Sequence, residues 1–371
     1  DQGLGIQARS YYSSLKEIGF EPYIFSFMPY HGNESNNYLQ NDVSEWKYDN
    51  VYYSRNIREN IQIEEIIDFV YFNKIKKIII IEATFENIFN IASLLKMLSI
   101  EIYLIVNIEC IKITELNYHY IFDKILCNNF NSYYILNNLI KNNKIEYLNF
   151  HLENKNINIY KKKYTKKNNN LIFVCSGGLN SISRKNIDKI IHLFYNLIVK
   201  NKISNVELRV LIQGIEVPTL INEYKNKNIK FIIENASYER NLKNISECDI
   251  FIHLGGQEGL GLGFYESLYL GVPVLTIDWT PNNEIVKDNI NGWLIKCNYD
   301  NVYENQECLI YRGMVIEELL EEKILNIYNN IENTINIINK TISNKESFYK
   351  KNKMKFLNNL KYNLSPTPNF N

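Results

Sequence analysis

Short apolar runs alternate along this chain with longer amphipathic stretches. Runs such as Lys77–Glu82 and Ile250–Leu254 are almost continuously apolar, whereas the stretches between such runs repeat apolar residues at helical spacing. Continuous apolar runs are typical of strands buried on both faces, and amphipathic stretches are typical of helices that cover a sheet. The pattern therefore predicts an α/β fold made of βαβ units around parallel sheets.

The first series of units predicts one doubly wound, Rossmann-like domain. A loop at Asp1–Gly5 leads into the first helix, and we expect that the strand before Gly3, with an initiating segment, is missing. The elements predicted after the loop are helices at Ile6–Ile18, Ile61–Phe72 and Phe85–Leu98 and strands at Tyr23–Phe27, Lys77–Glu82, Glu101–Val106 and Lys124–Cys127.

A second series follows the polar segment Lys141–Asn170. We interpret this segment as a solvated linker. The alternative is that its lysine run, Lys161–Lys167, attracts phosphate groups. The predicted domains are 1–160 and 161–344, with a C-terminal helix and tail at 345–371. The elements predicted in this half are strands at Leu171–Cys175, Val206–Ile212, Ile229–Ile233, Ile250–Leu254 and Pro273–Ile277 and helices at Asn186–Lys200, Tyr238–Cys248, Gly263–Leu270, Met314–Ile338 and Lys345–Leu360.

Composition excludes some classes of protein. The chain has 371 residues, enough for two cores, and 46% of them are hydrophobic. Its 41 basic and 41 acidic residues balance, so no overall field attracts nucleic acid or an anionic membrane. The six cysteines form no C-x-x-C pair, which predicts a reducing, cytoplasmic compartment rather than zinc cages or disulfides. The five histidines lack metal-ligand spacing, and we interpret them as structural or surface residues.

The densest chemical signal is the glycine-rich segment Leu254–Glu266, between a predicted buried strand and a helix. Glycines let the backbone approach a ligand, and the amides of a helix N-terminus suit a diphosphate, although any tight turn uses glycine. Glu258 lies in the turn, and Glu266 lies about one turn into the helix that follows. Carboxylates accept hydrogen bonds from the vicinal hydroxyls of ribose and sugars, but Glu266 also suits the helix dipole.

Further segments make the signal specific. Seven residues separate Glu258 from Glu266, and the pattern continues in Leu270-Gly271-Val272-Pro273-Val274, Asn283-Glu284-Ile285-Val286 and Asn291-Gly292-Trp293-Leu294. Together they resemble the signature of glycosyltransferase family 4, contiguously over Cys248–Leu294 and co-linearly over the rest. The resemblance implies the GT-B fold: two Rossmann-like domains that face a cleft, with a C-terminal helix returning to the first domain.

The resemblance also implies roles for single residues. Glu266 would bind the ribose hydroxyls of a nucleotide, and Glu258 would contact the donor sugar near the reacting centre. The donor diphosphate and sugar hydroxyls would be held by backbone amides, those of Gly259, Leu260, Gly261 and Leu262. From the first domain, the turn with Gly3 and Gly5 would face the donor phosphates.

The sequence departs from the family pattern at two places. The cations that would neutralise the diphosphate are Arg184 and Lys185, but Gly178 stands where an Arg is usual, and Asn186 replaces the Gly that usually follows the Lys. The alternative for this pair is exposed charge before a helix. The second departure is that no histidine follows the strand that ends at Val106, where the family often has one in its cleft. Asn107 and Glu109 are the candidates to replace it on the acceptor side. The alternative is that they are ordinary polar residues of a loop.

No D-x-D motif occurs, so we predict a site without metal or cofactor, in which amides, a helix dipole and cations take the charge. The basic segment Lys345–Lys361 is either a helix packed onto the first domain or an interfacial membrane helix that makes a peripheral contact.

The predicted function is retaining transfer of a sugar from a nucleotide-diphosphate donor to a hydroxyl of a glycan, lipid or protein. Two alternatives stay open. One is a nucleotide-sugar epimerase or hydrolase on the same fold, and the other is a non-catalytic nucleotide-sugar-binding or scaffold protein.

Overall fold

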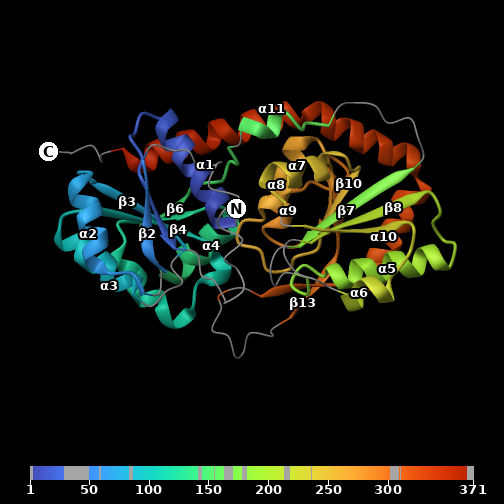
Figure 1. Ribbon diagram of the computed structural model, residues 1–371, viewed down its shortest axis with the longest axis horizontal. Helices are drawn as coiled ribbons and strands as arrows, with labels where there is room; N and C mark the ends of the chain where they lie inside the picture. Colours follow the sequence, from blue (N-terminus) through green and yellow to red (C-terminus); the bar gives the residue numbers. More distant parts are fainter. Residues whose placement is uncertain are drawn as a thin grey trace. The chain divides into compact units, whose positions relative to one another are not determined.

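A computed structural model of the chain forms two compact α/β units, drawn in Figure 1. The structure describes residues 3–28, 50–57, 60–82, 87–140, 144–153, 155–162, 170–177, 182–212, 218–234, 236–300, 309 and 311–365. Unit 1 comprises Asp1–Glu153, Asn305–Ile310 and Asn352–Asn371, and unit 2 comprises Asn154–Glu304 and Tyr311–Lys351. The α/β class and the parallel sheets predicted from the alternation of runs are confirmed.

Unit 1 contains a four-stranded parallel sheet in the order β3-β4-β5-β6 and a parallel pair, β1-β2. The strands are β1 (Ile24–Met28), β2 (Val51–Ile57), β3 (Lys77–Ile81), β4 (Glu101–Val106), β5 (Lys124–Cys127) and β6 (Ile145–Tyr147). The helices are α1 (Gly3–Glu17), α2 (Ile63–Phe72), α3 (Ile88–Met97) and α4 (Phe130–Ile140), with 3-10 segments η3 (Ile108–Cys110) and η4 (Ile113–Ile121). Strand β4 is at the centre of the core, and its Ile102–Val106 are all buried.

The predicted loop at Asp1–Gly5 is wrong for Gly3–Gly5, because α1 already begins at Gly3. The amides of a first helical turn need no acceptor within the helix, so glycines there do not prevent helix formation. The buried face of this helix includes Gln7, Ser10 and Tyr11, which follow helical spacing. The two glycines therefore lie in a helical turn instead of a loop.

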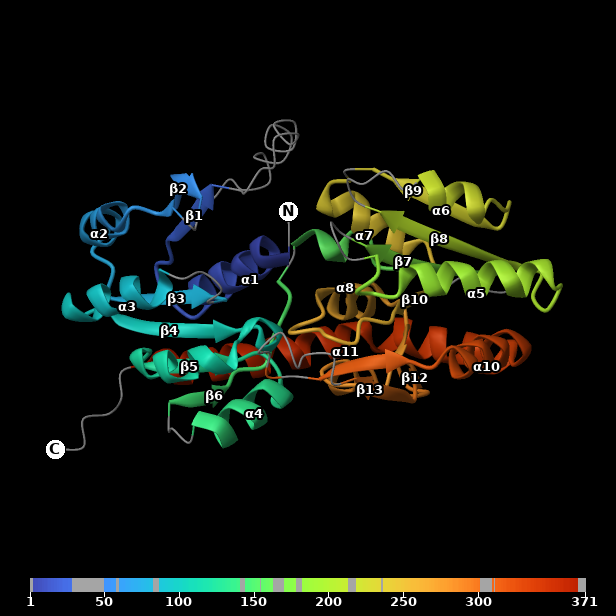
Figure 2. The same cartoon turned by 90° about the horizontal axis from the view of Figure 1, so that it is seen from below.

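Unit 2 is a six-stranded parallel sheet in the order β12-β11-β10-β7-β8-β9. The strands are β7 (Leu171–Gly177), β8 (Val206–Ile212), β9 (Ile229–Ile233), β10 (Ile250–His253), β11 (Val274–Ile277) and β12 (Gly292–Ile295). The chain first builds outward from β7 to β9, and then restarts at β10 on the other side of β7, an order visible in Figure 2. The switch point between β7 and β10 is where open α/β sheets bind ligands, outside the carboxyl ends of the strands.

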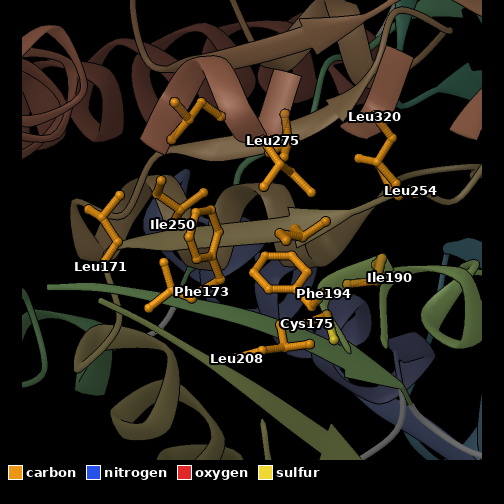
Figure 3. Close-up of a cluster of buried hydrophobic side chains, with 14 of the residues drawn as sticks. Leu171, Phe173, Cys175, Ile190, Phe194, Leu208, Ile250, Leu254, Leu275 and Leu320 are labelled. Carbon is orange, nitrogen blue, oxygen red and sulfur yellow. The ribbon is translucent and has the colours of Figure 1, made fainter. Parts of the chain in front are cut away.

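Helices cover both faces of this sheet. They are α5 (Ile187–Val199), α6 (Pro218–Glu223), α7 (Tyr238–Ser246), α8 (Leu262–Leu270) and α9 (Asn282–Ile285), with the 3-10 segment η5 (Lys155–Asn158). In Figure 1, α7 and α8 lie on one face and α5 lies on the other. Helix α5 buries Ile187, Ile190, Ile191 and Phe194 at helical spacing, and Figure 3 shows Phe194 packed among the side chains of β7.

The segment after β12 differs from the prediction. A single helix was expected over Met314–Ile338, but the structure has an antiparallel hairpin, β13 (Cys297–Asp300) and β14 (Arg312–Val315), followed by α10 (Glu317–Asn329) and α11 (Ile331–Leu364). Helix α10 begins after Ile316 with two glutamates in its first turn, which suit a helix N-terminus. No Gly or Pro interrupts 331–364, so α11 also continues through the expected break before Lys345.

The last helix packs its apolar residues against protein. In unit 1, Phe356 is fully buried beside the rings of Tyr11 and Phe150. In unit 2, the rings of Phe348 and Tyr349 contact Tyr269. The aromatic side chains that an interfacial membrane helix would insert into lipid are thus engaged within the protein. Among the described residues, no helix is both long and apolar enough to span a bilayer.

Candidate functional site

The candidate site of unit 2 lies at the switch point of its sheet. Three segments meet there: the loop before α5 with Arg184 and Lys185, the glycine-rich turn from β10 to α8, and strand β14. Arg184 donates hydrogen bonds to Glu258 Oε1 (2.8 Å) and to the Gln257 carbonyl (3.1 Å). These contacts connect the carboxyl ends of β7 and β10, so the structure brings together the predicted carboxylate and cation.

Glu258 is a buried anion among basic groups. Only 8% of its surface is exposed, and His253 Nε2 lies 3.1 Å from Oε1. Burial by itself would raise the pKa of Glu258, but His253, Arg184 and Lys185 together lower that pKa to about 2. Burial also lowers the pKa of His253. At neutral pH the site therefore holds an ionised Glu258 next to a histidine that burial keeps neutral.

Lys185 bonds to none of the residues that the structure describes. No hydrogen bond or ion pair joins its ammonium group to another residue in the described part of the chain. Burial lowers its pKa, whereas the nearby charges of Glu258 and Glu266 act in the opposite direction. An ammonium group held close to carboxylates without bonding to them is available to a ligand anion.

Glu266 is the only charged residue within Phe264–Leu270, a run whose residues are all buried. Only 7% of Glu266 is exposed. Burial raises its pKa, and the Tyr238 hydroxyl and the Lys185 charge act in the opposite direction. A carboxylate buried inside a helix is costly unless it serves as a hydrogen-bond acceptor, which makes Glu266 a candidate for ligand binding.

Asn186 explains one departure from the family pattern. This residue has φ of 54°, in the left-handed region that Gly adopts most easily and Asn tolerates among L residues. Its side chain also donates a 2.7 Å hydrogen bond to the Leu254 carbonyl at the end of β10. Asparagine therefore preserves the turn that glycine would make, and it adds a bond between the two segments of the site.

The glycine-rich turn is fixed from outside. Asn282 donates to the Gly255 carbonyl (3.0 Å) and to Thr276 Oγ1 (3.0 Å), and the Thr276 hydroxyl donates to the His253 carbonyl (2.6 Å). Gly261, with φ of 67°, then starts α8 in the left-handed region. The turn is thus held in place without using the side chains of Glu258 and Glu266.

Three consecutive amides of the turn face no protein acceptor. The N–H groups of Leu260, Gly261 and Leu262 donate no hydrogen bond to a residue within the part of the chain that the structure describes. They lie at the N-terminus of α8, where the helix dipole is positive. This arrangement can bind an anion or an oxygen-rich ligand.

Other predicted residues lie elsewhere. Gly3 and Gly5 are in the first turn of α1, Asn107 directly follows β4, and Glu109 lies in η3, all in unit 1. Asn107 Nδ2 donates to Glu82 Oε2 at 2.9 Å. Their predicted roles toward the donor phosphates and the acceptor stay predictions.

The lysine run is only partly described. Lys161 pairs with Glu346, and Lys162 bonds to the Cys248 carbonyl and to the buried Asp249. Burial lowers the pKa of Lys162 to about 8. These two lysines therefore have structural partners. The remaining lysines of the run, at positions 163, 166 and 167, and Gly178 lie outside the described residues.

Sequence reasoning missed three residues of the site. His253 was interpreted as structural or surface, but it lies beside Glu258, and its position at the end of the strand before the glycine-rich turn was the available signal. Asn282 was not predicted, although it directly precedes the motif segment that begins at Asn283. Arg312 carried no signal, because it lies before the helix predicted to start at Met314 and was assigned to no element.

Comparisons with known proteins show what this chain is similar to. Residues 156–306 match the sequence model of the family described as "Glycosyl transferases group 1". A search of the curated proteins found no match. The matched segment contains Arg184, Lys185, Glu258 and Glu266, and it ends before β14.

Solved structures share the fold at low identity. The Anabaena protein HepE in complex with UDP and glucose has 13% identity and a TM-score of 0.59, with 81% of each chain covered. The pneumococcal O-GlcNAc transferase GtfA in complex with UDP and GlcNAc has 14% identity and a TM-score of 0.58, with 81% of this chain and 60% of that chain covered. The apo structure of OtsA has 11% identity and a TM-score of 0.64, with 97% and 96% covered.

At these identities the likeness shows the fold alone, and that fold is GT-B. The sequence match adds the segment that holds the candidate site. The chain thus has the GT-B fold, and residues 156–306 support its assignment as a GT-B glycosyltransferase.

Proposed function

We propose that this protein transfers a sugar from a nucleotide-diphosphate donor to an acceptor hydroxyl, in the manner of glycosyltransferase family 4. The observation that carries the proposal is the arrangement around Lys185. At the switch point, an ammonium group and three amides that bond to no described residue lie together with two buried carboxylates, Glu258 and Glu266. The cation and amides suit a diphosphate, and the carboxylates suit the hydroxyls of ribose and sugar.

The donor would occupy the carboxyl edge of the unit 2 sheet. Glu266 accepts hydrogen bonds from the ribose hydroxyls, and the amides of Gly259–Leu262 hold the diphosphate and the sugar hydroxyls. Lys185 then lies next to the diphosphate, where negative charge grows as the nucleotide leaves. Glu258, fixed by Arg184, presents an anion toward the sugar.

The reaction would retain the anomeric configuration. The bond between the anomeric carbon and the diphosphate oxygen breaks, and the acceptor oxygen forms its bond to that carbon on the same face. The departing phosphate oxygen takes the acceptor proton. Lys185 and the amides stabilise the leaving group, and we assign no protein nucleophile.

The acceptor would be a glycan, lipid or protein hydroxyl, within carbohydrate biosynthesis, and Asn107 and Glu109 would lie on the acceptor side. We place the enzyme in the cytoplasm, including a peripheral position at a membrane surface. None of the five cysteines that the structure describes forms a disulfide with another described residue, which supports a reducing compartment.

We expect the reaction to need no metal ion. Lys185, the amides and the positive end of α8 supply the charge that a divalent cation would otherwise provide. Turnover should therefore be unchanged after thorough treatment with EDTA. Loss of turnover with EDTA, followed by its recovery with Mn²⁺ or Mg²⁺, would contradict this expectation.

Nucleotide affinity should depend on pH through Glu266. An ionised carboxylate accepts from both ribose hydroxyls, and the pKa of Glu266 is raised above 4.5 by burial. As the pH falls through this raised pKa, the ionised fraction of Glu266 decreases. On acidification, we therefore expect nucleotide affinity to start weakening while the pH is still above 4.5. Glu266→Gln should bind about 1.5–3 kcal/mol more weakly at neutral pH, the worth of a hydrogen bond to a charged group, and should lose the acid dependence.

Calorimetric titration of a nucleoside diphosphate across pH measures both effects. The control is Glu318→Gln, which changes an exposed carboxylate at the start of α10. The same acid profile in wild type and Glu266→Gln would remove Glu266 from the ribose site.

One observation favours a non-catalytic nucleotide-sugar-binding protein as the second candidate. Arg184 is bonded to Glu258, so Lys185 is the only one of the two predicted phosphate-neutralising cations that bonds to no described residue. Binding of the donor without turnover over a broad acceptor panel would support this candidate. Consumption of the donor without any acceptor would instead support an epimerase or hydrolase.

A thermal-shift screen against UDP-, GDP- and ADP-sugars tests the donor assignment. A ligand at about 100 times its dissociation constant stabilises a protein by about 2.7 kcal/mol, which such a screen detects. We expect one nucleotide class to stabilise the wild type and to stabilise Glu266→Gln less. Stabilisation by none of the three classes would contradict the proposed function.

A further inference from the structure

Strand β14 is seated directly on the glycine-rich turn. Gly313 N donates a 2.9 Å hydrogen bond to the Gly256 carbonyl, and a Cβ at Gly256 would collide with the Gly313 carbonyl. A Cβ at Gly313 would lie 2.7 Å from Trp279 Cγ and 2.9 Å from Ile277 Cδ1. Two glycines thus allow the hairpin and the turn to touch backbone to backbone, so β14 has one position relative to the turn.

The alternation of side chains along β14 places Arg312 on the face opposite to that of Gly313. The Gly313 face meets Trp279 and Ile277, and Arg312 reaches the loop before α5, where its Nη2 donates to the Ser183 carbonyl at 3.5 Å. Ser183 directly precedes Arg184 and Lys185. The guanidinium therefore lies against the loop that supplies the cations of the site.

The guanidinium of Arg312 has one buried N–H group without an acceptor among the described residues. Its Nε is buried without a partner, and no carboxylate among the described residues forms an ion pair with it. A buried guanidinium N–H without an acceptor is costly, and a guanidinium is suited to bidentate binding of phosphate. The long bond to Ser183 does not account for this arrangement.

The charges nearby indicate the sign of the missing partner. Glu258 pairs with Arg184, whereas neither Lys185 nor Arg312 forms an ion pair with a carboxylate of the described residues. Two such cations next to a helix N-terminus favour a ligand with more than one negative charge.

We propose that Arg312 of the β13–β14 hairpin binds the diphosphate of the nucleotide donor, as a second unpaired cation beside Lys185. This inference rests on the proposed function and deepens it. The hairpin strand lies beyond residues 156–306 that match the family, so the cation comes from an element outside the matched segment.

The test compares ligands that differ only in their phosphates. Calorimetry measures the binding of UDP, UMP and uridine, or of the guanosine or adenosine series if that nucleotide stabilises the wild type. Arg312→Ala should weaken binding of the diphosphate by about 10- to 100-fold, the effect of losing a charge-assisted hydrogen bond, and leave binding of the nucleoside unchanged. Arg312→Lys, which keeps the charge and loses the fork, should recover part of the loss.

The control is Lys202→Ala, which removes a surface cation paired with Glu321 before β8, at the other edge of the sheet. It should change neither affinity. Equal weakening of diphosphate and nucleoside by Arg312→Ala, or no weakening, would overturn the inference while the wild type still binds the diphosphate. A wild type that binds no nucleoside diphosphate would overturn the proposed function as well. Arg312→Lys separates the phosphate role from folding if the alanine variant is unstable.

Discussion

Lys185→Ala is expected to lower kcat by about a hundred- to a thousandfold, with a much smaller loss of donor affinity. The ammonium group has no bond to a described residue, and it lies near Glu258 and Glu266, where the proposed function places the departing diphosphate. The charge on the leaving group grows in the transition state, so a cation there acts mainly on the barrier. Removing one such contact from a water-excluded site costs about 2.7–4 kcal/mol.

Donor affinity should fall less because the free amides of the glycine-rich turn remain. Steady-state kinetics gives kcat, and calorimetry of the donor gives affinity. Lys189→Ala is the matched control, since this lysine lies one turn further along α5 and pairs with Glu317 at 3.2 Å. Equal, modest losses in kcat and affinity would mean that Lys185 only attracts the donor. No loss would place the phosphate ligands elsewhere, with the lysines of Lys161–Lys167 as the next candidates.

Glu258→Gln is also expected to lower kcat by about a hundredfold or more. Positive charge develops on the sugar as its bond to the diphosphate breaks, and the ionised Glu258 is the fixed anion that would stabilise it. Glutamine keeps the shape and can still meet Arg184 through its carbonyl oxygen, so the change removes charge with little change of packing. Glu247→Gln, at an exposed carboxylate paired with Arg209, serves as the control.

Glu258→Gln should also change how the stability of the protein depends on pH. The folded pKa of Glu258 is lowered from 4.5 to about 2, so its contribution to stability is complete above pH 4.5 and is lost as the pH falls toward 2. Thermal unfolding of the wild type should therefore lose stability across this window, and Glu258→Gln should lose less. An unchanged kcat together with parallel acid profiles would show that Glu258 neither stabilises the reaction nor forms the ion pair.

The strands of both sheets could be predicted because continuous apolar runs indicate parallel strands that are buried on both faces. The strands Glu101–Val106, Lys124–Cys127, Val206–Ile212 and Ile229–Ile233 have the predicted bounds. The hairpin was missed because Arg312–Val315 mixes a charge and a glycine into four residues and pairs with Cys297–Asp300, beyond an intervening segment. Its stability depends on tertiary contact with Gly256, which no local pattern contains.

The sequence indicated which residues form the candidate site, but it did not indicate which of them bond to one another. The spacing of Glu258 and Glu266 marked both carboxylates, and Arg184 and Lys185 were chosen as a pair. The structure separates the roles of that pair, because Arg184 bonds to Glu258 and Lys185 bonds to no described residue. His253 belongs to the site because it is buried next to Glu258 in the folded structure. Such distinctions depend on three-dimensional distance, which one sequence without its fold does not give.

Acceptor-dependent release of the nucleoside diphosphate tests the central claim most directly. Wild type and Lys185→Ala are incubated with the nucleotide-sugar that the thermal-shift screen selects, with and without a panel of glycan, lipid and peptide acceptors. The account predicts that the wild type releases the diphosphate only with an acceptor, that the sugar appears on an acceptor hydroxyl with its anomeric configuration retained, and that Lys185→Ala loses this activity. Donor consumption without an acceptor, or donor binding without any turnover, would contradict it.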